Sequence, residues 1–299
     1  DIFEFLLEAG ASPNVKNGNF QTVTYIAFLT KDDKVAEMIQ DKYNGDINAQ
    51  DQQMYSLAHH ALAQNDLSRI EYLSSRNINM DLKNNNGHSV FLMAYFTAIN
   101  FQTLQFLIDK GANVSSFDFQ GNTLLHHLFM MKNPRDDVYR FLIDNHIDIN
   151  IENQSLQFPI SIAIEMGHDK YGFELLNMNC RLLDKKSIHE PIVEALKRKN
   201  QKWVEELFKH GADGMNEHVG VISRYINSGF FNYKLFKNIP RMNIILEAPL
   251  QMALYKKFQD CAVDIWNMAN TEMNKILLAG NTDCYGRVLI SAAIMMNNE

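Results

Sequence analysis

Two pairs of adjacent histidines, His59-His60 and His126-His127, are the residues most suggestive of chemistry in this chain. A protein zinc site needs three or four ligands that converge on one point. Adjacent residues of a helix point to different sides, so neither pair can supply two converging ligands. No further Cys or His follows at a metal-ligand spacing. We therefore predict no metal site and interpret both pairs as structural.

A thiol site is the second chemical hypothesis, because Cys180, His189 and Glu190 are the residue types of a nucleophile, a base and an orienting group. The cysteines are widely spaced and form no C-x-x-C pair. Phosphate-binding loops, nucleophile elbows, dinucleotide fingerprints and zinc-protease motifs are also missing from the sequence. We predict no catalytic residue, no cofactor and no small-molecule substrate, and expect Cys180 to lie in a connecting loop.

The composition is that of a folded protein, with 46% hydrophobic and 21% charged residues among 299. A net charge of −7 argues against nucleic acid or an anionic membrane as the main partner. No apolar run approaches the length of a membrane span, so we expect no membrane insertion. Three widely spaced cysteines indicate a reducing, cytoplasmic environment.

A small or apolar residue recurs along the chain at a nearly constant spacing, and we call these positions markers. They are Ala27, Ala61, Ala94, Leu128, Ala163 and Ala195, which are separated by 34, 33, 34, 35 and 32 residues. Five residues before these markers stand the predicted helix starts Thr22, Ser56, Ser89, Thr123 and Phe158. Five residues earlier again stand the turn-forming residues Asn17, Asp51, Asn84, Asp118 and Asn153. A fixed period of this length predicts a solenoid.

A second apolar helix follows each marker, and in three copies it ends at a glycine: Gly10, Gly111 and Gly211. Glycine supplies the left-handed backbone that terminates a helix. The chain begins within the end of such a unit, so we expect its first repeat to be truncated at the N-terminus.

The unit resembles the ankyrin repeat. The resemblance rests on G-N-T-L-L-H at 121–126, G-H-S at 87–89, F-P-I at 158–160 and G-A-N-V at 111–114. It implies an all-α solenoid of about eight or nine helix pairs with short β-hairpin connections. We expect residues 1–213 to form repeats and residues 214–299 to form degenerate repeats with a C-terminal cap. A tetratricopeptide array would need a W-x-x-L-G-x-x-Y helix, which this chain lacks.

The resemblance also implies a binding surface and a structural role for the first histidine of each pair. His59 and His126 are expected to bond backbone between repeats. A partner protein is expected on the concave face and hairpin tips, at Gln52, Gln53, Tyr55, Asn85, His88, Phe96, Phe119, Gln120, Asn122, Met130, Met131, Gln154 and Met166. An alternative concerns Phe20, Met54 and Leu156, which replace a turn glycine. There the hairpin could be rebuilt, so that some of these side chains pack inward.

The resulting hypothesis is a non-enzymatic protein-binding module. Its degenerate repeats and its Asn-, Lys- and Ile-rich composition are similar to those of ankyrin effectors that intracellular bacteria secrete into the host cytosol. A rival hypothesis is the substrate-recruiting part of a larger enzyme, whose catalytic unit lies outside the chain or in the irregular region 214–247. A third possibility is hydroxylation of Asn14 and Asn150, as occurs in this family.

Overall fold

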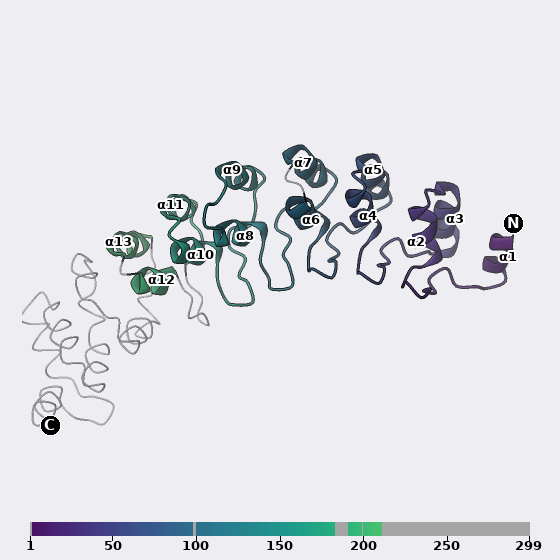
Figure 1. The fold of residues 1–299 in the computed structure, drawn as a ribbon, viewed down its shortest axis with the longest axis horizontal. Coiled ribbons are helices and arrows are strands. Elements are labelled where there is room, and N and C mark those ends of the chain that lie inside the picture. Colours follow the sequence, from purple (N-terminus) through teal and green to yellow (C-terminus); the bar gives the residue numbers. More distant parts are fainter. Residues whose placement is uncertain (1, 98–99, 183–190, 199, 211–299) are drawn as a thin grey trace, which may run out of the picture. The chain divides into compact units, whose positions relative to one another are not determined.

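The computed structural model describes residues 2–97, 100–182, 191–198 and 200–210, and there the chain folds into helices joined by short connections (Figure 1). The chain divides into two compact units, residues 1–148 and 149–299. None of the described helices is long and apolar enough to cross a membrane.

Unit 1 begins with the single helix α1 and continues with helix pairs, in which a first helix is followed by an antiparallel second helix. Its helices are α1 (Ile2–Glu8), α2 (Val23–Leu29), α3 (Asp33–Tyr43), α4 (Leu57–Ala63), α5 (Leu67–Ser75), α6 (Val90–Thr97), α7 (Phe101–Asp109), α8 (Leu124–Met130) and α9 (Asp136–Asp144). The first helices α2, α4, α6 and α8 form one row, and α3, α5, α7 and α9 form the other (Figure 1). The turns that precede the first helices extend away from the row of second helices.

The described part of unit 2 contains two further pairs: α10 (Pro159–Met166) with α11 (Asp169–Asn177), and α12 (Pro191–Lys197) with α13 (Gln201–Lys209). Helix α10 also packs against α12, so the contacts between first helices continue here. Gly172 of α11 lies where an added Cβ would overlap the Trp203 ring of α13. The Trp203 ring stacks on Phe173 with centroids 4.2 Å apart, and its Nε1 donates to Asp169 Oδ1 at 2.6 Å.

The small or apolar marker positions predicted from the sequence are all buried, from Ala27 to Ala195. Helix α6 is buried on every side except at its C-terminal end, because neighbouring repeats cover both of its flanks. The predicted helix starts are also confirmed. The Thr22 hydroxyl accepts from the Tyr25 N–H at 3.1 Å, and Ser56 and Thr123 form capping boxes with the histidine three residues on. Phe158 cannot cap in this way, and Pro159 fixes the first turn instead.

The loops that follow the second helices are tied from one repeat to the next by a side chain. Asn14 Oδ1 accepts from the Asp46 N–H at 2.8 Å, and Asn48 Oδ1 accepts from the Asn79 N–H at 2.7 Å. Asn150 Oδ1 likewise accepts from the Arg181 N–H in unit 2. Asn14 and Asn150 therefore have a role in the fold, and their hydroxylation stays a hypothesis.

The all-α repeat architecture is confirmed. The connections expected as β-hairpins are tight turns, and among the described residues a β-bridge forms only between Phe117 and Thr123. These turns are too short to carry a ladder of paired residues. The predicted helix end at Gly211, the degenerate repeats of residues 214–299 and the C-terminal cap lie outside the described residues.

Candidate functional site

Each described turn before a first helix is built around one short polar side chain. Asp118 Oδ1 accepts from the backbone N–H groups of Gln120 and Asn122, at 2.9 and 2.8 Å. Asp51 does the same for Gln53 and Tyr55, both at 2.9 Å. The same pair of bonds recurs at Asn17, Asn84 and Asn153. A repeated side-chain bond therefore gives every turn the same shape.

The residue before the turn's last position has a left-handed backbone in every copy. Gly87 and Gly121 have φ of 79° and 78°, and glycine adopts this conformation freely. Phe20, Met54 and Leu156 stand at the same position with φ of 63°, 58° and 58°. Their side chains are 52%, 37% and 37% exposed. The alternative of a rebuilt hairpin with inward-packed side chains is therefore wrong, because the turn's side-chain bonds hold its shape.

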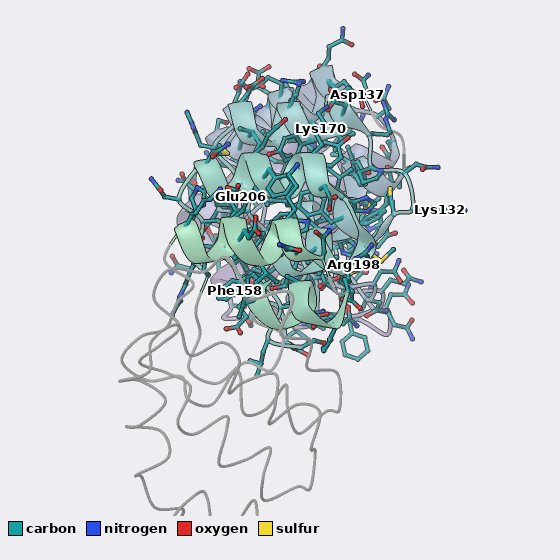
Figure 2. The ribbon with its side chains drawn as sticks, turned by 90° about the vertical axis from the view of Figure 1, so that its left-hand side faces the viewer. Lys132, Asp137, Phe158, Lys170, Arg198 and Glu206 are labelled. Atoms are coloured by element: carbon teal, nitrogen blue, oxygen red, sulfur yellow. The ribbon has the colours of Figure 1, made fainter. Side chains whose placement is uncertain are left out.

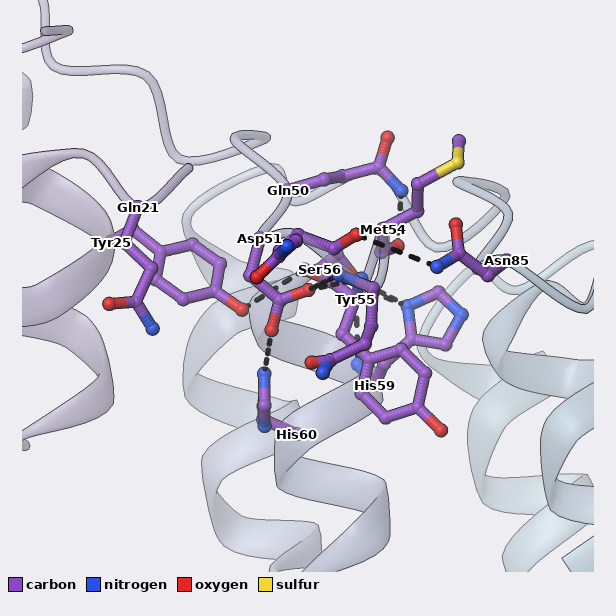
Figure 3. Close-up of polar contacts among 12 residues, drawn as sticks. Gln21, Tyr25, Gln50, Asp51, Met54, Tyr55, Ser56, His59, His60 and Asn85 are labelled. Atoms are coloured by element: carbon purple, nitrogen blue, oxygen red, sulfur yellow. Dashed lines mark hydrogen bonds and ion pairs between the residues drawn. The ribbon is translucent and has the colours of Figure 1, made fainter. Parts of the chain in front are cut away.

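The first histidine of each pair is structural, as expected. His59 is fully buried, and its Nδ1 accepts from the Ser56 N–H at 3.2 Å (Figure 3). Its Nε2 then donates to the carbonyl oxygen of His88, in the next repeat, at 3.0 Å. Burial lowers the pKa of His59 to about 4, so the ring is neutral at neutral pH. His126 is buried in the same way, with Nδ1 2.8 Å from the Thr123 hydroxyl.

The second histidine of each pair has a partner that the sequence analysis missed. His60 Nε2 lies 2.9 Å from Asp51 Oδ2 (Figure 3). His127 Nε2 lies 2.8 Å from Asp118 Oδ2. The available signal was the shared nine-residue spacing between aspartate and histidine. Each aspartate is thus bonded by its turn through one oxygen and by the first helix through the other. These pairs hold the turns against the helices.

Cys180 follows the end of α11 and is buried. Burial raises the pKa of its thiol to about 12, so the thiol is protonated and a poor nucleophile at neutral pH. His189 and Glu190, its hypothetical partners, lie outside the described residues. Within the described residues no group of three or more His, Cys, Asp or Glu side chains is placed to hold a metal ion.

Large apolar side chains are exposed on the first-helix side of unit 1. Phe96, Phe119, Met130 and Met131 are 42%, 44%, 41% and 37% exposed. The Phe96 ring stacks on His88 with centroids 4.6 Å apart, and it meets the edge of His127 at 5.1 Å. His88 and Phe96 come from one repeat and His127 from the next. The aromatic contacts therefore continue across the boundary between these two repeats.

The remaining predicted surface residues are placed as follows. Gln52, Gln53, Asn85 and Gln120 are exposed at the turns, and Tyr55 is half-buried with its ring stacked on His59 at 5.5 Å. In unit 2, Gln154 and Met166 are exposed. Asn122 is a correction, because it is 8% exposed and its Nδ2 lies 3.4 Å from Asp118 Oδ2. Its side chain belongs to the turn framework.

Paired antiparallel helices joined by turns of one repeated design define a helical-repeat solenoid. Residues 57–153 contain ankyrin repeats, since they match the family model for ankyrin repeats in three copies. Ankyrin repeats are generally modules for protein–protein interaction.

Among solved structures, the chain is similar to the crystal structure of the ankyrin repeat domain of Bcl-3, described as a unique member of the IkappaB protein family. The identity is 16% and the TM-score 0.46, over 81% of this chain and 97% of that chain. No curated protein matches the chain.

Proposed function

We propose that this protein binds another protein through an inner stripe on unit 1, made of Tyr55, His88, Phe96, Phe119, Met130 and Met131. The observation that carries the proposal is the exposure of large apolar side chains at neighbouring turns and first helices. Apolar surface of this kind, gathered in one place, marks interaction sites more often than it marks ordinary surface. We propose the exposed Gln154 and Met166 of unit 2 as further contacts.

Three residues of the inner stripe each contact a residue of a neighbouring repeat. Phe96 contacts His127 of the next repeat, and Tyr95 directs its hydroxyl toward Met131 Sδ at 4.0 Å. Gly87 lies against Phe119, so that an added Cβ would be 2.7 Å from the Phe119 nitrogen. These contacts hold the rings before a partner arrives, which lowers the entropy cost of binding.

The chemistry of the inner stripe suits a protein partner. Aromatic rings supply large contact areas and are enriched among the residues that dominate binding energy. Methionine side chains at the end of α8 are unbranched and polarizable, so they can adapt to an irregular apolar surface. Gln52, Gln53, Asn85 and Gln120 add exposed amides around this apolar centre. We assign these amides to the polar rim of the interface.

The proposal is tested by affinity capture from cell lysate with immobilised protein, comparing the wild type with Phe119→Ala plus Met131→Ala. We expect the recovery of at least one captured protein to be about tenfold or more lower on the double variant than on the wild type, because the variant lacks two interface anchors. Phe5→Ala is the matched control, because Phe5 is 68% exposed on α1 and lies outside the inner stripe. Equal recovery of every captured protein on wild type and double variant would exclude the stripe.

We propose further that the partner is a host protein and the chain a secreted effector. Support comes from the degenerate repeats and the Asn-, Lys- and Ile-rich composition. Capture from animal-cell and bacterial lysates in parallel tests this extension, and specific partners only in the bacterial lysate would contradict it. The rival hypothesis places a catalytic unit outside this chain or at 214–247, beyond the described residues, and nothing in the described part favours it.

A further inference from the structure

The turns of unit 1 are linked to one another as well as to their helices. The Gln52 N–H donates to the Asn19 carbonyl at 3.0 Å, and the Asn85 N–H donates to the Gln53 carbonyl at 3.1 Å. Lys83 Nζ then reaches the Asp118 carbonyl of the fourth turn at 3.4 Å. Four consecutive turns therefore form one continuous edge with a fixed backbone.

At two positions on this edge the turn requires a left-handed backbone, and the chain places a large apolar residue there although glycine fits the same position in other repeats. Where this chain needs a left-handed backbone elsewhere, it repeatedly uses asparagine, as at Asn44, Asn65, Asn77 and Asn179. Phe20 and Met54 are large, adopt φ of 63° and 58°, and stay exposed. Both side chains keep a large exposed part, 52% for Phe20 and 37% for Met54, although each adopts a strained backbone. Strain of this kind is concentrated at functional sites.

The turn edge carries two lysines, Lys16, which is exposed, and Lys83, which is half-buried and interacts electrostatically with Asp118 and the exposed Asp81. Lys16 Nζ lies 5.8 Å from the centre of the Phe20 ring, and Lys83 Nζ lies 3.9 Å from that of Phe117. Neither lysine forms an ion pair with any described residue. The carboxylates within the turns, Asp51 and Asp118, are buried and bonded to histidines.

The second helices differ from this edge because most of their cations are neutralised. Arg69 pairs with Asp33. Arg76 pairs with Asp41 at 2.5 Å, and Lys110 pairs with Glu71 at 2.6 Å. In a protein with a net charge of −7, a carboxylate-bearing partner therefore meets repulsion over most of the surface. The turn edge is one part of unit 1 where lysines without an ion pair can complement the charge of such a partner.

We infer that the turn-edge surface, made of Lys16, Phe20, Met54, Lys83, Phe117 and Phe119, binds a protein segment that presents carboxylates beside large apolar side chains. The two lysines receive the carboxylates, and the phenylalanines and Met54 receive the apolar groups. The inference rests on the proposed function and specifies its partner. A nucleic acid is disfavoured, because its phosphate chain requires a broad basic face. Two lysines in an acidic protein do not provide one.

The test is selection of a random peptide library on the whole 299-residue protein, followed by fluorescence anisotropy on the enriched peptides. We expect enrichment of Asp or Glu beside Phe, Leu or Trp. Lys16→Gln plus Lys83→Gln should lower the affinity for these peptides by about five- to tenfold at low salt, and by less at high salt. The charge control is Lys34→Gln, because Lys34 is exposed on α3 and pairs with no described residue. It should change affinity by less than about twofold.

A second variant separates binding from folding. Phe20→Asn plus Met54→Asn should raise Tm, because asparagine tolerates the left-handed backbone, and should weaken the same peptides. Enrichment of basic or neutral peptides, or acidic peptides unaffected by the double lysine variant, would overturn the inference. Binding of a labelled single-stranded oligonucleotide that depends on the two lysines would overturn it too. If partners are lost on Phe119→Ala plus Met131→Ala and not on the lysine variant, the inner stripe stands and this inference fails.

Discussion

At the scale of single residues, two adjacent histidines have different roles although their sequence looks symmetrical. His59 is fully buried and bridges two repeats, whereas His60 is partly exposed and bonds the turn aspartate. The difference arises because adjacent residues on a helix point about a quarter-turn apart. Only His59 faces the neighbouring repeat, and its burial lowers its pKa to about 4.

Buried His59 should make stability depend on pH. Its folded pKa of about 4 is below the ordinary value of 6.5, so the unfolded state binds the proton more readily. The neutral His59 ring therefore contributes about 3 kcal/mol to the free energy of unfolding. This contribution is fully present above pH 6.5 and is lost as the pH falls toward 4. Urea unfolding at pH 7 and pH 4.5 measures it. His59→Gln should show a smaller difference between the two pH values than the wild type, and an equal difference would contradict this assignment.

At the scale of elements, side-chain hydrogen bonds give the turn before each described first helix of unit 1 the same shape. Asp51 and Asp118 each bond two backbone N–H groups of the turn and one histidine of the following helix. This bonding explains why the turn keeps its shape when a bulky residue replaces glycine. At Phe20 and Met54 the cost is paid as backbone strain rather than as a change of structure.

Relief of this strain is measurable. Met54→Asn should raise the free energy of unfolding by about 0.5–1 kcal/mol, because asparagine tolerates a left-handed backbone better than an unbranched apolar residue. Chemical denaturation of the single variant gives the value. Leu156→Asn in unit 2 provides an independent repeat of the experiment, since Leu156 has the same φ of 58°. A loss of stability in both variants would show that these apolar side chains contribute to folding.

Helix packing in unit 2 makes a separate prediction. In Gly172→Ala the added Cβ would overlap the Trp203 ring, so α11 and α13 must separate. We expect a loss of about 1–3 kcal/mol, as is usual for overpacked sites. Thermal unfolding monitored by tryptophan fluorescence measures it. Gly18→Ala is the control, because a Cβ there meets nothing within 4 Å and should leave the melting curve unchanged.

At the scale of the whole molecule, the repeat was predictable and the details of its surface were less so. Burial of one small residue per repeat is a local requirement of close helix packing, so the markers from Ala27 to Ala195 were visible in the sequence. The bond between Asp51 and His60 depends on how a turn folds back on its helix, which the repeat period does not specify. The burial of Asn122 has the same origin, because Asp118 draws both the backbone and the side chain of Asn122 into the turn.

The binding surface likewise contains residues that the repeat period predicts and residues that it does not. Phe96, Phe119, Met130 and Met131 are exposed as expected, because the repeat phase alone places their positions on the first-helix side. The apolar residues Phe20 and Met54 were treated as replacements for glycine and were omitted from the predicted surface. Their exposure follows from a backbone conformation that only the folded turn imposes.

The central claim is that the inner stripe touches a partner protein, and site-specific photo-crosslinking tests it most directly. A photoreactive phenylalanine analogue is placed at Phe96, at Phe119 or at Phe5, and the protein is irradiated in cell lysate. We predict that the same partner is crosslinked from positions 96 and 119 and not from position 5. A partner crosslinked from position 5 and from neither stripe position would contradict the account.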